Sequence, residues 1–96
     1  MASPTGRMRA VRRRADIVWR RLDGGAVGLD LGTSRYFSLN GSAAELWVLL
    51  CDYREPEALV DHLVDRFGID PARATSDVER FLSELARWDL MEERVG

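Results

Sequence analysis

The chain has 96 residues, of which 46% are hydrophobic and 31% are charged. This length suits one domain with a modest core, and the balance excludes a chain that is disordered throughout. No run approaches the roughly 18 consecutive apolar residues of a membrane span. The arginine-rich start lacks the apolar segment of a secretory signal peptide, and a single cysteine excludes an internal disulfide. We therefore expect a cytoplasmic protein.

The net charge of −2 divides unevenly along the chain. Residues 1–21 carry +6, whereas residues 22–96 carry −8. Residues 1–15 combine five arginines with no hydrophobic period, and blocks of like charge repel each other and are often disordered. We predict a disordered basic tail over residues 1–15 and a folded domain over residues 16–93. A basic arm that contacts nucleic acid or an acidic partner is the alternative interpretation.

Three short segments have the pattern of β-strands. Residues 16–22 are rich in β-forming side chains, residues 26–31 alternate apolar with small or polar side chains, and residues 35–39 place Phe37 opposite Tyr36. The apolar side chains that share one face of the second segment are Val27, Leu29 and Leu31. Turn signals at residues 23–25 and 32–34 separate the segments, so we predict an antiparallel meander with a tight hairpin at Asp23-Gly24.

The hydrophobic period changes from 2 to about 3.6 at Asn40, which marks the start of a helix. Asn40 and Ser42 are both good N-cap residues, and Ser42 with Glu45 fits a capping box. This helix is predicted to end near Cys51, whose apolar surroundings favour a buried side chain.

Two further helices complete the predicted fold. Pro56 suits the first position of a helix that ends at Gly68, and Asp70-Pro71 opens a third helix that runs to about Trp88. The sequence therefore predicts the α+β class, with a three-stranded antiparallel sheet followed by three helices.

Signatures of catalysis are scarce in this chain. One histidine and one cysteine cannot fill a structural zinc site, and His62 lies off the apolar stripe of its helix, so we expect it to be exposed. No glycine-rich loop lies between a strand and a helix in the phosphate-binding order. We predict a protein that is not an enzyme and that carries no cofactor, metal or catalytic residue.

The order of several motifs is similar to that of a known family. The motifs are Val27-Gly28-Leu29-Asp30-Leu31, Arg35-Tyr36-Phe37-Ser38-Leu39-Asn40, Ala44-Glu45-Leu46-Trp47, Leu59-Val60-Asp61-His62-Leu63, Phe67-Gly68-Ile69-Asp70 and Asp77-Val78-Glu79-Arg80-Phe81-Leu82-Ser83-Glu84-Leu85. From about Ile17 to Glu92 the chain thereby resembles the PqqD-like family. It departs from the family pattern at Arg54-Glu55-Pro56, where a Ser or Thr usually opens the second helix, and at Trp88-Asp89-Leu90, where a Gly often ends the third helix.

The resemblance implies a winged-helix-like fold and the role of a recognition element for ribosomally synthesised, modified peptides. Such a domain binds the leader segment of a precursor peptide and delivers it to a partner enzyme. The chain looks most like the stand-alone recognition subunit of lasso-peptide pathways, whose partner is a cysteine peptidase that removes the leader.

The third predicted strand is the expected docking site. As an edge strand it exposes unpaired backbone groups, to which an extended peptide can add as a further strand. The resemblance implies that the third helix forms the opposite wall of this groove. The predicted peptide-binding residues are Arg35, Tyr36, Phe37, Ser38, Leu39, Asp77, Phe81, Glu84 and Trp88.

Two other functions compete with peptide binding. A winged-helix protein with an arginine-rich arm suits DNA binding, although acidic residues dominate residues 22–96 and the third helix alternates charges of opposite sign. A dimerisation module that pairs through the same exposed edge is the second alternative. For Phe81, a place in the core competes with a place in the groove.

Overall fold

A computed structural model describes residues 9–95 of the chain. The elements in chain order are β1 (Arg9–Arg13), β2 (Ile17–Leu22), β3 (Gly25–Asp30), β4 (Arg35–Asn40), α1 (Gly41–Leu49), α2 (Pro56–Phe67), α3 (Pro71–Arg87) and β5 (Met91–Val95). The predicted meander and three helices are confirmed, whereas β1 and β5 were not predicted. No helix among the described residues has the length and apolar character needed to cross a membrane.

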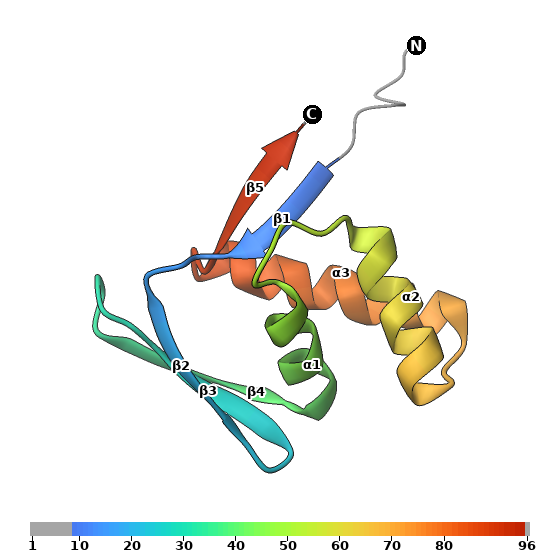
Figure 1. The fold of residues 1–96 in the computed structure, drawn as a ribbon, viewed down its shortest axis with the longest axis horizontal. Coiled ribbons are helices and arrows are strands. Elements are labelled where there is room, and N and C mark those ends of the chain that lie inside the picture. Colours follow the sequence, from blue (N-terminus) through green and yellow to red (C-terminus); the bar gives the residue numbers. More distant parts are fainter. Residues whose placement is uncertain (1–8, 96) are drawn as a thin grey trace.

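The sheet that dominates one end of the molecule has the strand order β2-β3-β4 (Figure 1). All pairs are antiparallel, and the register sets Trp19 opposite Gly28 and Gly28 opposite Phe37. The β2–β3 hairpin turns through only Asp23 and Gly24, and Gly24 has the positive φ of 76° that such tight turns require. Strands β2 and β4 are therefore the two edges of this sheet.

Helix α1 packs its aromatic side chain against the inner face of the sheet. Trp47 is fully buried, and its ring lies edge-on to those of Phe37 at 5.3 Å and Trp19 at 6.4 Å between centroids. Gly28 lies beneath the Phe37 ring, where a Cβ atom would come within 2.2 Å of a ring carbon. A residue without a side chain is therefore required here, because the aromatic cluster occupies the space above β3.

The face of β3 that points toward the core is consequently not its more hydrophobic face. Ala26, Gly28 and Asp30 face the core and are buried, whereas Val27 on the opposite face is exposed. The Asp30 carboxylate accepts a hydrogen bond from the Gly32 amide at 2.9 Å and lies 3.7 Å from Arg14, which makes its burial tolerable.

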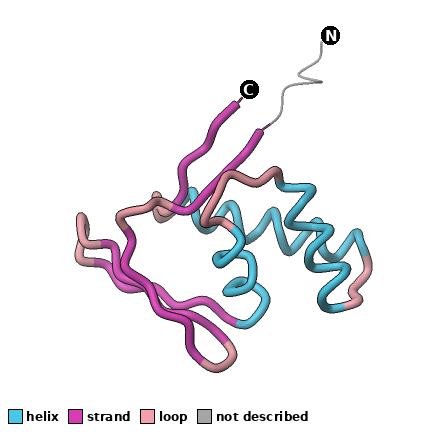
Figure 2. Tube along the Cα trace, in the orientation of Figure 1, coloured by secondary structure: helices cyan, strands magenta, loops and turns pink. Residues whose placement is uncertain are grey.

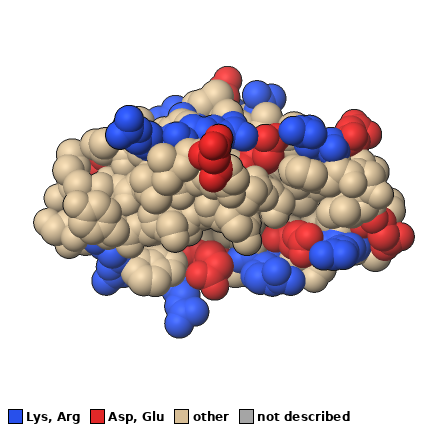
Figure 3. Space-filling model, turned by 90° about the horizontal axis from the view of Figure 1, so that it is seen from below, with Lys and Arg blue, Asp and Glu red and all other residues tan. Residues whose placement is uncertain are grey.

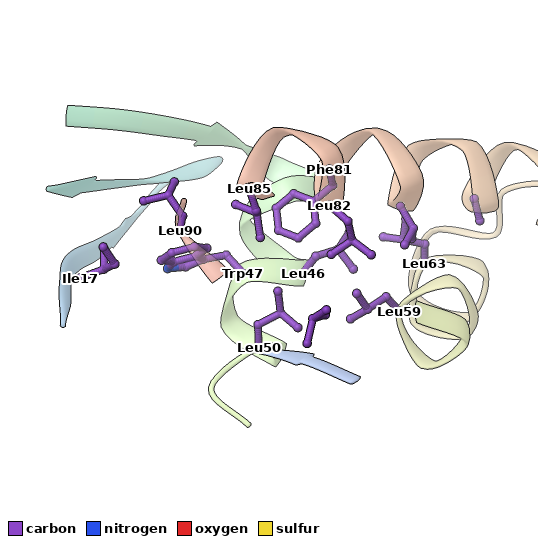
Figure 4. Packing of buried hydrophobic residues seen from close by; sticks show 13 residues of the cluster. Ile17, Leu46, Trp47, Leu50, Leu59, Leu63, Phe81, Leu82, Leu85 and Leu90 are labelled. Carbon is purple, nitrogen blue, oxygen red and sulfur yellow. The ribbon is translucent and has the colours of Figure 1, made fainter. Parts of the chain in front are cut away.

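Helices α2 and α3 pack on each other and on the far side of α1. Figure 4 shows Phe81, Leu82 and Leu85 of α3 above Leu46 and Trp47 of α1, with Leu59 and Leu63 of α2 beside them. The Asp70 side chain caps α3 by accepting the Ala72 amide at 3.0 Å. Asp89, at φ 57°, takes the left-handed position just after α3, a conformation that glycine adopts most readily.

The chain ends pair as a two-stranded ribbon of β1 and β5. The register joins Arg9 with Val95 and Arg13 with Met91, and Figure 2 shows the ribbon apart from the main sheet. Backbone bonds of 2.8 Å also join Val11 to Arg54 in both directions. The predicted disordered tail is therefore wrong for Arg9–Arg13, while residues 1–8 lie outside the described residues.

Two side chains differ from their predicted exposure, and the structure selects one of the two predicted N-cap residues of α1. Cys51 is exposed, because it lies in the turn after the end of α1 at Leu49, beyond the buried Leu50. Asn40 is the N-cap of α1 and accepts the Ala43 amide at 3.3 Å, so Ser42 is not the cap. His62 is half-buried rather than exposed, since its Nε2 lies 3.0 Å from the carboxylate of Glu45.

The Glu45 carboxylate connects three elements through that contact. It accepts a hydrogen bond from Arg21 of β2 at 2.7 Å and lies 3.8 Å from Arg66 of α2. The hydrogen bond with His62 and that from Arg21 hold the pKa of Glu45 below its ordinary value. A lowered pKa in the folded protein means that this carboxylate contributes stability above its unfolded-state pKa and loses it as the pH falls through the folded-state value.

Because the Val11 side chain is fully buried within the core, we expect β1 to contribute to folding stability. Val11→Ala should lower the free energy of unfolding by about 1.5–3 kcal/mol in urea denaturation. Arg9→Ala is the matched control, because it removes only an exposed ion pair with Glu93 and should cost at most about 1 kcal/mol. Equal and small losses in both variants would show that β1 is not part of the cooperative unit.

Candidate functional site

The edge of β4 presents backbone groups that no strand of the described chain covers. The two-residue turn requires Leu22 and Gly25 to form a hydrogen-bonded pair, and the bonding direction then alternates along β3. Ala26, Gly28 and Asp30 therefore bond toward β4, where their partners are Leu39, Phe37 and Arg35. It follows that the N–H and C=O groups of Tyr36 and Ser38, and the N–H group of Asn40, point outward from the sheet edge, while the Asn40 carbonyl belongs to the N-cap of α1.

A groove runs between this edge and α3. Its volume is about 400 Å³. The lining residues are Ser38, Leu39 and Asn40 of β4, Ser42, Ala43 and Leu46 of α1, Leu63 of α2, and Arg73, Asp77, Arg80, Phe81 and Glu84 of α3. One side of the groove thus offers unpaired backbone, and the other offers helical side chains.

The floor of the groove is apolar and is continuous with the core. Phe81 is only 7% exposed and belongs to the core cluster, while Leu39 and Ala43 pack against that cluster and are half-buried. Phe81 therefore serves both as core and as groove floor, which resolves the two interpretations that its sequence position left open. This floor can accept an apolar side chain of limited size.

Charged residues of both signs line the α3 side of the groove. Asp77 lies 4.0 Å from Arg73 and 3.5 Å from Arg80, and both arginines are largely exposed. Such exposed pairs contribute little to stability, so these side chains remain free to rearrange around a ligand. Glu84 forms no ion pair with any of the described residues 9–95.

One end of the groove is marked by a contact between β4 and α3. The guanidinium carbon of Arg35 lies 4.4 Å from the centroid of the Trp88 ring, which is a cation–π contact. Trp88 is 38% exposed and follows the last residue of α3. Arg35 and Trp88 thus meet beyond the hollow rather than in its lining.

Five of the nine predicted site residues line the groove in the structure, and the other four lie outside its lining. Ser38, Leu39, Asp77, Phe81 and Glu84 line the groove together. Of the others, Phe37 packs on Trp47, and Tyr36 is 77% exposed on the outer face of the sheet. The prediction missed the lining residues Asn40, Ser42, Ala43, Leu46, Leu63, Arg73 and Arg80. Of these, Leu46 and Leu63 reach the groove through the packing of α1 and α2.

The outer face of the sheet is a second unusual surface, because no helix covers it. By the strand register, one row across it is Val18, Leu29 and Tyr36, the next is Arg20, Val27 and Ser38, and Leu22 lies in the row beyond. Val18 is 55% exposed. Figure 3 shows a broad uncharged area on the underside of the molecule, with side chains of both signs along its margins. Exposed apolar area of this kind often marks a protein contact.

Residues that could bind a metal ion do not gather anywhere in the described chain. No group of three or more His, Cys, Asp or Glu residues has suitable positions between residues 9 and 95. The chemistry that the groove offers is recognition by backbone hydrogen bonds, an apolar floor and a charged rim.

The different burial of the two aromatic residues of α3 predicts different effects of truncation. Phe81→Ala should lower the free energy of unfolding by about 3–5 kcal/mol, because it leaves a cavity in the core. Trp88→Ala should lower it far less, since the ring is partly exposed and lies beyond the helix end. Chemical denaturation of both variants measures this difference, and a larger loss for Trp88→Ala would contradict the assignment.

Comparisons with known proteins agree on one family. No curated protein sequence matches the chain. The chain is similar to TbiB1, solved in complex with the TbiA(beta) leader peptide, with 30% identity and a TM-score of 0.77 over 84% of this chain and 94% of that one.

Two further solved structures share the fold. A lasso peptide synthetase B1 complexed with the leader peptide has 24% identity and a TM-score of 0.73, covering 85% of this chain and 96% of that one. The PqqD truncation of Methylobacterium extorquens PqqCD, a recognition element for ribosomally synthesised and post-translationally modified peptides, has 21% identity and a TM-score of 0.70, covering 86% and 88%. Residues 25–91 match the family described as coenzyme PQQ synthesis protein D, so the chain belongs to the PqqD family.

Proposed function

We propose that this protein binds the leader segment of a ribosomally synthesised precursor peptide in the groove between β4 and α3. The observation that carries the proposal is the open edge of β4, whose outward backbone groups lie beside a groove with an apolar floor. An extended peptide adds there as a further antiparallel or parallel strand. Main-chain bonds supply affinity, and the floor sets the register of the peptide by accepting one side chain.

The comparisons support this choice of ligand. Two of the similar structures were solved with a leader peptide bound, and a third is a peptide recognition element. We favour a lasso-peptide type of precursor, because one of the two leader complexes is that of a lasso peptide synthetase B1, which covers 85% of this chain. The protein itself acts by binding rather than by catalysis, and we place it in the cytoplasm, where ribosomal precursors are made.

DNA binding is not favoured by the arrangement of charge. Phosphate recognition needs a concentrated basic surface. The arginines of α3 instead alternate with acids, and Arg73 and Arg80 share Asp77 between them. Arginines of β1 likewise face acids of β5, as in the contact of 2.6 Å between Arg9 and Glu93.

A partner enzyme completes the proposed role. We infer that a leader peptidase, or another modifying enzyme, contacts the uncovered outer face of the sheet formed by Val18, Leu22, Val27, Leu29 and Tyr36. A peptide strand added to β4 continues the rows of this face, so that its own outward side chains extend the same surface. The enzyme would then contact the domain and the bound leader together.

The proposed binding mode predicts a sharp effect of proline at the sheet edge. Ser38→Pro removes an outward N–H group and should weaken binding of the leader by at least about tenfold. Ser38→Ala is the matched control and should bind normally, because the bond comes from the backbone. Isothermal titration with a leader peptide of the lasso type measures both.

The same titration distinguishes the alternatives. A random DNA duplex at moderate salt should bind more weakly than the leader, and tighter binding to DNA would overturn the proposal. Light scattering tests the dimerisation alternative. If the natural protein is a dimer that does not bind the leader, and Ser38→Pro converts it to a monomer, the β4 edge serves dimerisation instead. Thermal unfolding of each variant confirms that the sheet is intact.

The outer face predicts a separable defect. Val18→Glu places a charge in the apolar face, on the strand farthest from the groove, and should leave leader affinity unchanged while it weakens capture of the partner enzyme by about tenfold or more. Phe67→Glu is the control, because Phe67 is a similarly exposed apolar residue at the end of α2. Co-purification of the enzyme in the presence of leader measures the effect, and equal capture by both variants contradicts this placement.

A further inference from the structure

Arg35 is the charged residue of β4 that faces the same side as the groove floor. Side chains alternate along a strand, so Arg35 shares its face with Phe37 and Leu39. Its guanidinium rests on the Trp88 ring at 4.4 Å, which places it at the α3 side of the sheet edge. Arg35 thus lies in line with the floor of the groove, four residues from Leu39.

Arg35 also lacks a carboxylate partner in the described chain. Its neighbour across the sheet, Asp30, is instead close to Arg14 and the Gly32 amide. None of the ion pairs among residues 9–95 includes Arg35. Stacking on an aromatic ring orients the guanidinium plane and leaves its edge donors available, and these donors match a carboxylate in two-point geometry.

We propose that Arg35, held by Trp88, forms a second subsite that takes an acidic side chain of the bound peptide. This inference rests on the proposed function and adds a chemical class and a spacing to it. A peptide strand paired with β4 turns every second side chain toward α3. The residue opposite Leu39 enters the apolar floor, and the residue opposite Arg35 is four positions away in either strand direction. The preferred ligand therefore carries an apolar residue and an Asp or Glu four residues from it.

Glu84 limits how far the acidic side chain can approach along the groove. It lies one helical turn before Trp88 and lines the groove. A ligand carboxylate that moved from Arg35 toward the floor would meet this like charge. Glu84 thereby separates an apolar end of the groove from an anion-accepting end, and it fixes the spacing between the two.

Selection from a random library tests this without knowledge of the natural ligand. The probe is a library of 12-residue random peptides displayed on mRNA and selected on the full chain. Enriched peptides should align on an apolar residue with Asp or Glu at least about threefold enriched four positions away. With Arg35→Glu, enrichment at that position should pass to Lys and Arg, and with Glu84→Gln the acidic preference should extend toward the apolar residue.

A matched pair of variants separates recognition from a structural role. Arg35→Lys keeps the charge and should retain a weaker acidic preference, whereas Arg35→Gln should lose it while the apolar preference remains. In a double-mutant cycle, an enriched peptide and its Glu→Gln form should differ about tenfold in affinity for the natural protein and hardly at all for Arg35→Gln.

The outcomes distinguish this inference from the function on which it rests. Apolar enrichment without an acidic preference, or an unchanged preference in Arg35→Gln, overturns the subsite and leaves peptide binding in the groove intact. The selection can also yield no peptide that competes with the leader for the β4 edge, the binding that Ser38→Pro is expected to weaken. That result overturns both the acidic subsite and the proposed peptide binding. Thermal unfolding of Arg35→Gln shows whether the contact with Trp88 only fastens β4 to α3, in which case stability falls and the charge preference does not change.

Discussion

The contact of Trp47 with the inner face of the sheet determines the arrangement of the remaining elements. Its ring meets Trp19 and Phe37 from two different strands, and Arg13 closes the cluster from above, with its guanidinium 4.8 Å from the Trp19 ring. Arg13 also donates to the Trp47 carbonyl at 2.8 Å, near the end of α1, where the same carbonyl accepts the Leu50 amide at 3.2 Å. One aromatic residue thus joins the sheet, the first helix and the N-terminal strand.

That arrangement leaves the β4 edge open for a physical reason. Helix α1 follows β4 directly after Asn40 and turns back across the inner face of the sheet, so it cannot also cover the edge of the strand from which it starts. Helix α3 approaches the same edge but packs through Phe81 on α1 and not on the backbone of β4. The gap between an unpaired strand and an amphipathic helix follows from this packing, and it combines unsatisfied backbone groups with accessible apolar surface.

The sequence supports the fold where local chemistry is decisive. Asp23-Gly24 predicted the hairpin, the period change at Asn40 predicted α1, and Pro56 and Asp70-Pro71 predicted the starts of α2 and α3; all agree with the structure. The β1–β5 ribbon was not predictable in this way, because its strands are separated by most of the chain and Val11 is the one fully buried residue of β1, between arginines. Seven of the twelve residues that line the groove were missed, and two of these, Leu63 and Leu46, reach it through helix packing alone.

Hydrophobicity also misled where shape decided the outcome. Val27 and Leu29 form the more apolar side of β3, yet the side with Ala26 and Gly28 faces inward because the Phe37 ring needs the space above a glycine. The aromatic cluster contributes more burial than the displaced aliphatic side chains could. The outer face of the sheet carries these apolar side chains although it is turned away from the core, so folding does not require them to be apolar. This is the physical reason to assign the face to contact with another protein.

The arginines near the N-terminus illustrate how composition differs from surface chemistry. A count of charges suggests a basic arm, but the described arginines of this segment bind within the molecule. Arg12 lies 3.7 Å from Glu92 and 5.2 Å from the Tyr53 ring, and Arg14 contacts Asp16 at 2.6 Å and donates to the Asp89 carbonyl at 2.8 Å. Each pair alone contributes little, but together they join the two chain ends and the loop after α3. Cations engaged in this way are not free to replace the counterions of a phosphate backbone, whereas Arg35, which has no acidic partner among residues 9–95, lies at the groove.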